Sequence, residues 1–225
     1  MASYKTVEIK EDIISRNNQG ASRIREGLKG KGVFYLNVMS SPGSGKTTLL
    51  KRVIDRLKGD FCIGVIEADI DSEEDAGAIA EATGVKTIQM HTGGACHITC
   101  QMSEEALEAL GVDGLNFVIL ENIGNLVCPA EFDTGAHENL VLLSVPEGDD
   151  KPLKYPLMFE VATMVAITKT DVMPVFDFSV DRAKENIRMR NEKAPVFVTC
   201  ARTDEGVEEL TEYIRGKAEG ICGRK

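Results

Sequence analysis

The run from residue 40 to residue 48, SSPGSGKTT, carries the residue types that bind nucleotide phosphates. In such a loop, small residues let backbone N–H groups turn inward around phosphate oxygens. The Lys reaches the β- and γ-phosphates, and the next hydroxyl binds Mg²⁺. Ser40 replaces the first Gly of the G-x-x-x-x-G-K-[ST] pattern, yet the run predicts a nucleoside triphosphate site. The residues expected to contact the nucleotide are Gly43, Ser44, Gly45, Lys46, Thr47 and Thr48.

Residues 168–171, TKTD, follow a buried-strand pattern and favour guanine as the base. GTPases recognise guanine at this place with an N-K-x-D element, whose Asp accepts hydrogen bonds from two guanine nitrogens. An adenine ring would leave that carboxylate unpaired. Thr168 replaces the Asn here, so Lys169 and Asp171 are expected to carry the recognition. A small-residue loop at Ala201 is expected to close over the base through its backbone N–H.

Two acidic residues at strand ends, Asp69 and Glu121, are expected to face the nucleotide. A carboxylate beside the phosphate loop holds Mg²⁺ directly or through water. Glu121-x-x-Gly124 also has the form of a switch that senses the γ-phosphate. Asp71 is a further candidate, although Asp69 and Asp71 also suit a helix cap. The residues expected to serve catalysis are Lys46, Asp69 and Glu121, and those expected around Mg²⁺ are Thr47, Asp69 and Glu121.

Cys96 and His97 are adjacent, and Cys128 lies four residues beyond Gly124. Sulfur and imidazole ligands suit Zn²⁺ or Ni²⁺ rather than Mg²⁺ or Ca²⁺, and water or a second subunit would supply a fourth ligand. The Cys-His pair is expected to open a helix, which lowers the pKa of a thiol. On spacing alone, Cys96 and Cys128 fit the hydrophobic core better than a metal site, and Cys100 fits either a ligand set or the core.

The elements that position these residues alternate between strand-like and helix-like patterns. Strands are expected at 33–40, 61–67, 85–90, 116–121, 140–145, 164–168 and 195–200. Helices are expected at 8–28, 46–57, 72–83, 97–110, 179–191 and 206–217. The alternation predicts an α/β fold, a mostly parallel sheet with helices on both faces. Cys62 and Cys200 are expected in the core and Cys222 in a frayed tail.

The composition is that of a globular protein, with 225 residues, 43% hydrophobic and 28% charged. A formal net charge of −10 disfavours nonspecific binding to nucleic acids and binding to anionic membrane surfaces. Apolar runs fall short of the about 20 residues that cross a bilayer, and the N-terminus lacks a secretory apolar core. We expect a cytoplasmic protein, with an N-terminal helical extension at 1–30 and one P-loop GTPase domain at 31–225.

Taken together, five runs resemble the HypB family, the hydrogenase nickel-incorporation GTPases. They read SSPGSGKTT, IEADID, HTGGACH, ENIGNLVCP and SVPEGDDKPLKYP, and the similarity extends from about residue 33 to residue 215. The related urease accessory GTPases belong to the same P-loop group but carry Cys-Pro-His. Here Pro129 is followed by Ala130 instead of His, which argues against membership of the urease accessory group.

The resemblance implies a SIMIBI-like P-loop fold that binds GTP or GDP with Mg²⁺. It also implies that Cys96, His97 and Cys128 bind Zn²⁺ or Ni²⁺ at the interface of a GTP-dependent homodimer. Family members deliver nickel, with a partner chaperone, to the precursor of the [NiFe]-hydrogenase large subunit. Residues 1–60 contain no Cys and no His, so no tight nickel store is expected in them.

The segment after Glu121 also carries Cys128, so loss of the γ-phosphate is expected to shift one metal ligand. Intrinsic hydrolysis is expected to be slow, because no cis arginine finger is evident. Two alternatives stay open. A P-loop small-molecule kinase would transfer the phosphoryl group to an acceptor and usually has an Arg-rich lid. A non-catalytic metal carrier would use GTP only to hold its dimer together.

Overall fold

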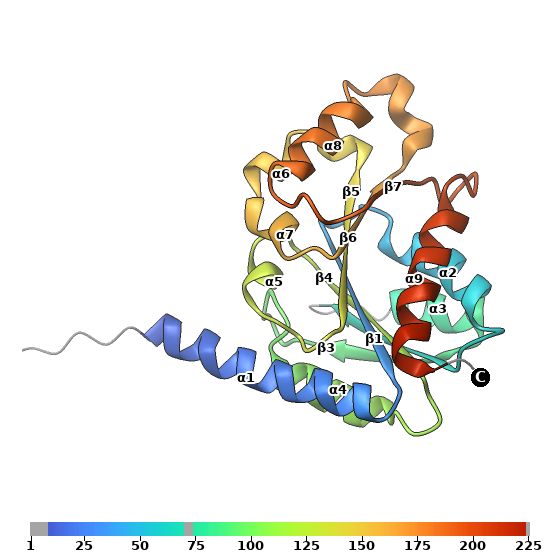
Figure 1. The fold of residues 1–225 in the computed structure, drawn as a ribbon. Helices are drawn as coiled ribbons and strands as arrows, with labels where there is room; N and C mark the ends of the chain where they lie inside the picture. The colour runs from blue at the N-terminus through green and yellow to red at the C-terminus, as the bar shows by residue number, and fades with distance from the viewer. Residues whose placement is uncertain (1–8, 70–73, 224–225) are drawn as a thin grey trace, which may run out of the picture.

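A seven-stranded parallel sheet forms the centre of the protein (Figure 1). The computed structural model describes residues 9–69 and 74–223. The strand order is β3-β2-β4-β1-β5-β6-β7, and every neighbouring pair is parallel. The strands are β1 (Phe34–Ser40), β2 (Ile63–Asp69), β3 (Lys86–His91), β4 (Phe117–Gly124), β5 (Glu138–Ser144), β6 (Met164–Thr168) and β7 (Val196–Val198). The predicted parallel sheet is therefore confirmed.

Helices cover both faces of the sheet, as predicted. The α-helices are α1 (Ile9–Gly30), α2 (Lys46–Leu57), α3 (Glu74–Thr83), α4 (Cys100–Leu110), α5 (Cys128–Glu131), α6 (Lys151–Lys154), α7 (Pro156–Glu160), α8 (Val180–Arg188) and α9 (Val207–Cys222). Two 3₁₀ segments, η1 (Val145–Glu147) and η2 (Thr170–Val175), follow β5 and β6. Among the helices in the described part of the chain, none has the length and apolar character that a membrane crossing requires.

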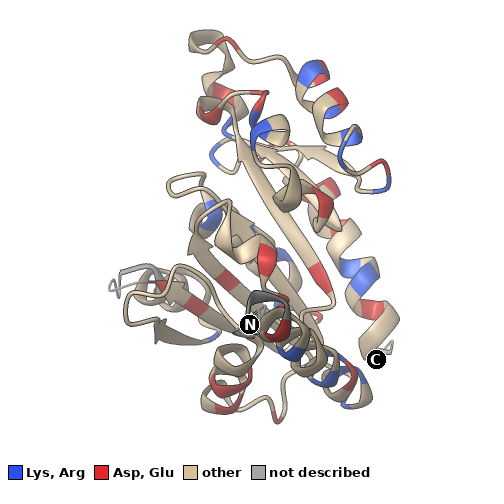
Figure 2. Ribbon diagram, turned by 90° about the vertical axis from the view of Figure 1, so that its left-hand side faces the viewer, with Lys and Arg blue, Asp and Glu red and all other residues tan. Residues whose placement is uncertain are grey.

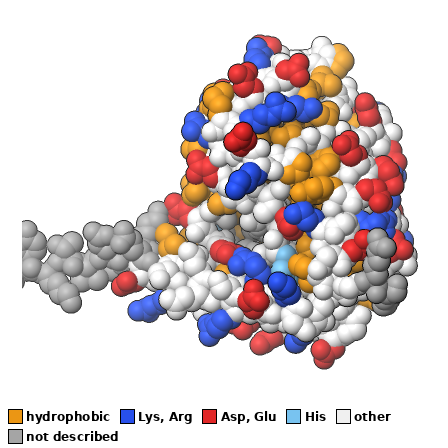
Figure 3. Space-filling model, viewed as in Figure 1, with side chains coloured by type: hydrophobic (Ala, Val, Ile, Leu, Met, Phe, Trp, Pro, Cys, Tyr) orange, Lys and Arg blue, Asp and Glu red, His pale blue; other side chains and the backbone are white. Residues whose placement is uncertain are grey.

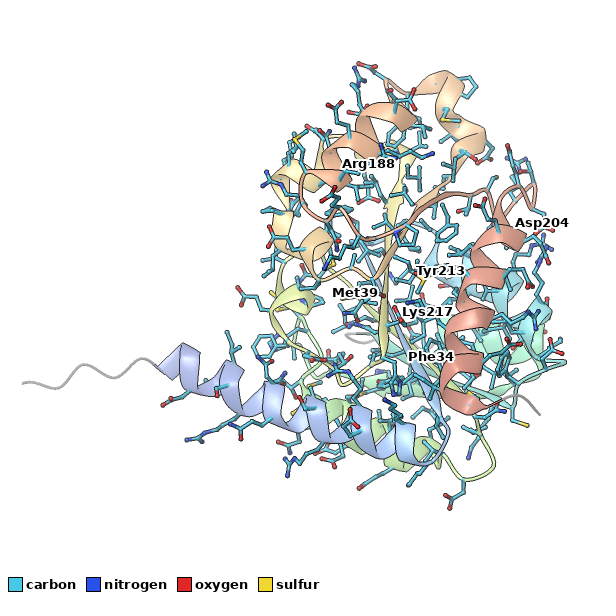
Figure 4. All side chains as sticks on the ribbon, in the orientation of Figure 1. Phe34, Met39, Arg188, Asp204, Tyr213 and Lys217 are labelled. Carbon is cyan, nitrogen blue, oxygen red and sulfur yellow. The ribbon has the colours of Figure 1, made fainter. Side chains whose placement is uncertain are left out.

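The core has two sides because successive strand residues point to opposite faces. Phe34, Leu36 and Val38 of β1 pack with α2, α3 and α9. On the other face, Tyr35 packs with α1 and α4, while Met39 packs with α5, α7 and α8. Figure 4 labels Phe34 and Met39 on the central strand. A loop that leads from a strand end to a helix can therefore place its residues on either face of the sheet.

Charged residues of both signs are distributed along the helices, whereas the strands carry few charges (Figure 2). On the face seen in Figure 3, Lys and Arg side chains lie among Asp and Glu side chains and apolar patches. Several ion pairs lie between elements, including Arg56 with Asp204 and Lys217 with Glu138. These pairs are partly exposed. Ion pairs at a protein surface typically contribute up to about 1 kcal/mol each to the free energy of unfolding.

Some sequence-based boundaries were wrong. Helix α4 begins at Cys100 rather than residue 97, because the Thr99 side chain accepts a hydrogen bond from Met102 N and caps the helix there. Helix α9 continues to Cys222, whose thiol donates to Asn116 O, so this residue does not lie in a frayed tail. Cys200 is buried as expected, but Cys62 is exposed. The predicted start of the helix at 72–83 lies outside the described residues.

Candidate nucleotide and metal sites

The phosphate loop connects β1 to α2, the strand–loop–helix arrangement expected from its sequence. Ser40, which replaces the usual Gly, is fully buried, and its Oγ accepts hydrogen bonds from Ser44 Oγ at 2.5 Å and Lys46 Nζ at 3.1 Å. Its own hydroxyl donates to Ser41 O. The substitution therefore fits the loop, because Ser40 holds the Lys46 ammonium group at the place where phosphates would lie.

The loop is also tied to the strand that carries the base-recognition element. Thr168 Oγ1 donates to Ser44 O at 2.8 Å, and Lys169 Nζ donates to Gly43 O at 2.6 Å. Thr168 stands where guanine-binding proteins of this pattern have Asn. Its hydroxyl supplies a link between β6 and the phosphate loop, so the missing Asn does not leave these two segments unconnected.

A cavity of about 210 Å³ lies beside these residues. Its lining is formed by Ser44, Gly45, Thr48, Leu49, Thr168, Lys169, Asp171, Val172, Cys200, Ala201 and Arg202. Asp171 is paired with Arg202 at 3.6 Å, and the Arg202 side chain is 85% exposed. The structure thus brings together Lys169, Asp171 and Ala201, the three residues predicted to hold the base, in one cavity next to the phosphate loop.

The predicted Mg²⁺ ligands Thr47 and Glu121 meet at the start of α2. Thr47 Oγ1 donates to Glu121 Oε1 at 2.8 Å, and Glu121 is 2% exposed. Asp69 ends β2, on the same face of the sheet as Glu121. A hydroxyl and two carboxylates offer hard oxygen ligands, which fits Mg²⁺. Asp71, the further candidate, lies outside the described residues.

Glu67, the first acid of the IEADID run, was not among the predicted ligands, and it lies level with Glu121. The two residues are register partners on β2 and β4, and Glu67 is 3% exposed. Gln89 donates a hydrogen bond to its carboxylate from β3. A buried acid within an apolar strand was the available signal, because carboxylates are rarely buried without a partner. Glu67 therefore extends the acidic group at this strand edge.

Cys96, His97 and Cys128 come together from two segments separated in sequence. Their ligand atoms all lie within 4.8 Å of one another, and Cys96 Sγ is 3.7 Å from His97 Nδ1. This is the one group of three or more such side chains found among the described residues, and Cys100 is outside it. Two sulfurs and one imidazole are borderline-soft ligands that fit Zn²⁺ or Ni²⁺.

The expected electrostatics of the Cys-His pair were wrong in one respect. A hydrogen bond with Cys128 raises the pKa of the Cys96 thiol. The pair also precedes α4 by a few residues instead of opening it. Burial lowers the pKa of His97, whose ring stacks on Phe132 with centroids 3.9 Å apart. The imidazole is therefore kept neutral for ligation, whereas Cys96 must release its proton when a metal binds.

A short connection joins the nucleotide and metal sites. Gly124 lies against the phosphate loop so closely that a Cβ there would be 2.9 Å from Pro42 Cα. The next residue, Asn125, donates from Nδ2 to Cys96 O at 3.1 Å and accepts from Val127 N at 2.9 Å. The segment from Glu121 to Cys128 therefore contacts the phosphate loop at one end and the metal cluster at the other.

Known proteins are similar to this chain in sequence and in overall fold. Residues 34–198 match the family described as CobW/HypB/UreG, nucleotide-binding domain. The hydrogenase/urease maturation factor HypB of Helicobacter hepaticus is 43% identical over 217 residues, covering 95% of this chain and 88% of that protein. The hydrogenase maturation factor HypB of Escherichia coli (strain K12) is 38% identical over 214 residues, covering 95% and 73%.

The chain belongs to the HypB family. A crystal structure of HypB from Helicobacter pylori in complex with nickel superposes with a TM-score of 0.85 at 40% identity, covering 91% of this chain and 96% of that one. HypB from Archaeoglobus fulgidus gives 0.83 at 31% identity, covering 91% and 99%. A LAO/AO transport system kinase, 20% identical with a TM-score of 0.56, shares the fold alone. This HypB-family chain therefore has the P-loop nucleotide-binding fold of the hydrogenase maturation factors.

Proposed function

We propose that this HypB-family protein is a GTP-hydrolysing metallochaperone that binds nickel or zinc and assists nickel insertion into the [NiFe]-hydrogenase large subunit. The observation that carries the proposal is the meeting of Cys96, His97 and Cys128, within 4.8 Å, at the end of the segment that begins at Glu121. The names and the nickel complex of its relatives point the same way. Nickel is the cargo in this proposal.

The nucleotide in the proposal is GTP. Asp171 would accept hydrogen bonds from two guanine nitrogens, and Lys169 already bridges to the phosphate loop through Gly43 O. Lys46 would leave Ser40 Oγ and bind the β- and γ-phosphates. Thr47, Asp69 and Glu121 would hold Mg²⁺, which when bound neutralises charge on the phosphates. Lys46, Asp69 and Glu121 are thus the proposed catalytic residues.

The proposed switch runs through the segment between Glu121 and Cys128. Contacts with the γ-phosphate would hold Glu121 and Gly124 in place. The loss of these contacts after hydrolysis would allow Asn125 and Cys128 to move relative to Cys96. A change in one ligand's position changes metal affinity, and linkage requires that metal change nucleotide affinity equally. We further propose a GTP-dependent homodimer in which the exposed Cys96 faces the second subunit.

A nucleotide-dependent sizing experiment with metal analysis tests this proposal. The intact chain with a non-hydrolysable GTP analogue and nickel is expected to elute as a metal-bearing dimer. Cys96→Ala and Cys128→Ala should keep nucleotide and lose the metal. Cys62→Ala, which removes an exposed thiol outside the cluster, is the matched control and should keep the metal. Retention of nickel by both cluster variants would refute the assigned site.

The alternative of a non-catalytic carrier is separated by a second measurement. Nickel affinity is compared in the GTP-analogue and GDP states of the intact chain, under conditions that permit dimerisation. A switch predicts different affinities, whereas a carrier predicts the same affinity and no release of phosphate from GTP. Transfer of phosphate to a small-molecule acceptor instead of water would identify a kinase.

A further inference from the structure

Asn17 of α1 connects the two segments that carry the metal ligands. Its Nδ2 donates to Asp133 O at 2.8 Å, and its Oδ1 accepts from Cys100 N at 2.8 Å. The residue is 6% exposed, and its partners lie 116 and 83 positions away in the sequence. One amide therefore contacts both segments, each a few residues from a ligand.

On the first segment, the bond to Cys100 fixes the beginning of α4. The first N–H groups of a helix have no partner within the helix, so a buried one needs an acceptor from elsewhere. Asn17 supplies that acceptor for Cys100 N, three residues after His97. Gly20, one turn further along α1, lies so close that a Cβ there would be 2.4 Å from Cys100 Sγ. The close approach leaves Cys100 packed on α1.

On the second segment, the bond to Asp133 fixes the residue that follows Phe132. The Phe132 ring stacks on His97 at 3.9 Å, so its position decides where the imidazole lies. Arg25, two turns further along α1, donates from Nη2 to both Asp133 carboxylate oxygens at 2.7 Å and from Nε to Ala136 O. Helix α1 therefore holds the loop after α5 by two side chains.

From these contacts we infer that Asn17 is a positioning residue for the Cys96–His97–Cys128 cluster. The inference rests on the proposed function only in treating that cluster as the metal site. Asn17 itself is not a ligand, and it acts by keeping the loop before α4 and the loop after α5 at a fixed separation. Partners of this kind, beyond the ligands themselves, set metal affinity by orienting the ligands. Figure 1 shows α1 running beside α4 below α5.

Asn17→Ala tests the inference with two measurements on the full-length protein. In nickel titrations, the dissociation constant is expected to rise about 10-fold or more, the usual effect of removing such a supporting contact. The second measurement needs no metal. Phenylarsine oxide bridges two thiols within reach of each other, and its rate of binding to Cys96 and Cys128 should fall by a similar factor. The rate measured in Cys128→Ala, which lacks one thiol of the pair, gives the background reaction of the other thiols and is subtracted.

The matched control is Asn18→Ala, which removes the exposed asparagine next along the same helix and should change neither measurement. Binding of a fluorescent GDP analogue should stay unchanged in Asn17→Ala, because the residues that line the base cavity do not include any from α1. Wild-type nickel affinity and wild-type arsenical rate in a variant that binds GDP normally would overturn the inference.

A second variant serves if Asn17→Ala fails to fold. Arg25→Gln removes the ion pair with Asp133 from a partly exposed position, and it should change both measurements in the same direction by a smaller factor. No change with Arg25→Gln would then overturn the inference. Failure of the proposed function is distinguishable. Retention of nickel by Cys96→Ala and Cys128→Ala refutes the metal site, while the arsenical rate in Asn17→Ala still reports whether Asn17 positions the two thiols.

Discussion

The nucleotide site is built on strand ends and one helix start, whereas the metal cluster rests on two loops that side chains hold together. The phosphate loop begins at the end of β1, and Asp171 lies three residues after the end of β6. Cys96 and His97 instead precede α4 by a coil, and Cys128 begins the four-residue helix α5. Groups fixed by a sheet keep one geometry, while groups held by a few hydrogen bonds can change theirs. This difference suits a nucleotide site with a fixed geometry and a metal site whose ligands can change position.

The largest effect that would test the comparison is expected from Lys46→Ala. Loss of charge-assisted bonds to phosphate should cost about 3 kcal/mol, or roughly 100-fold in GTP affinity. Nickel affinity without nucleotide should stay unchanged, because the metal cluster consists of Cys96, His97 and Cys128 and does not include Lys46. Isothermal titration with each ligand separately checks both parts. The control is Lys51→Ala on the same helix. A parallel loss of nickel binding would show that the two sites are not structurally separate.

A smaller, more selective effect is expected from Asp171→Ala. Guanine differs from hypoxanthine by the exocyclic amino group, which Asp171 is expected to bind. The preference for GTP over inosine triphosphate should therefore disappear, a change of about 10- to 100-fold in the affinity ratio. Competition binding with the two nucleotides measures the ratio. Asp177→Ala, at an exposed carboxylate in a loop before α8, should preserve the preference. An unchanged ratio in Asp171→Ala would move base recognition elsewhere.

The smallest effect is expected for the pH dependence of stability, through His137. This residue contacts α1, the helix that holds the loops carrying the metal ligands. His137 Nδ1 accepts from Tyr35 N, and its other nitrogen lies 3.1 Å from Arg25 O on α1. Burial lowers the pKa of His137 below its ordinary value of 6.5. The unfolded chain then binds more protons, so this stability is fully present above pH 6.5 and is lost as pH falls from that value through the lower folded-state pKa.

Thermal unfolding between pH 7.5 and pH 5 checks this expectation. The midpoint should fall less steeply in His137→Asn, which can keep an acceptor for Tyr35 N and does not titrate. Part of the slope should persist, because burial also lowers the pKa of His97. His91→Gln at an exposed position is the control. Equal slopes in His137→Asn and wild type would assign the pH dependence to other groups.

The phosphate loop and the seven strands could be predicted from residues that are neighbours in the sequence. SSPGSGKTT lies between an apolar run and a helical pattern, and each predicted strand appears in the structure. Helix α4 was placed three residues early because Thr99 competes with earlier positions as a cap, and the apolar pattern does not reveal which residue wins. The short helices α5, α6 and α7 were not predicted, since about one turn of helix has no periodic signal.

The amino-acid sequence therefore indicated which functional groups are present: a phosphate loop, a carboxylate suited to guanine, and thiols together with an imidazole. The fold was needed to show that Cys128 meets Cys96 and His97, that Glu67 lies level with Glu121, and that Asn17 connects both metal-bearing loops. These residues are far apart along the chain. Local patterns fix backbone conformation over a few residues, but contacts across many positions depend on how the sheet orders its strands and where the helices pack.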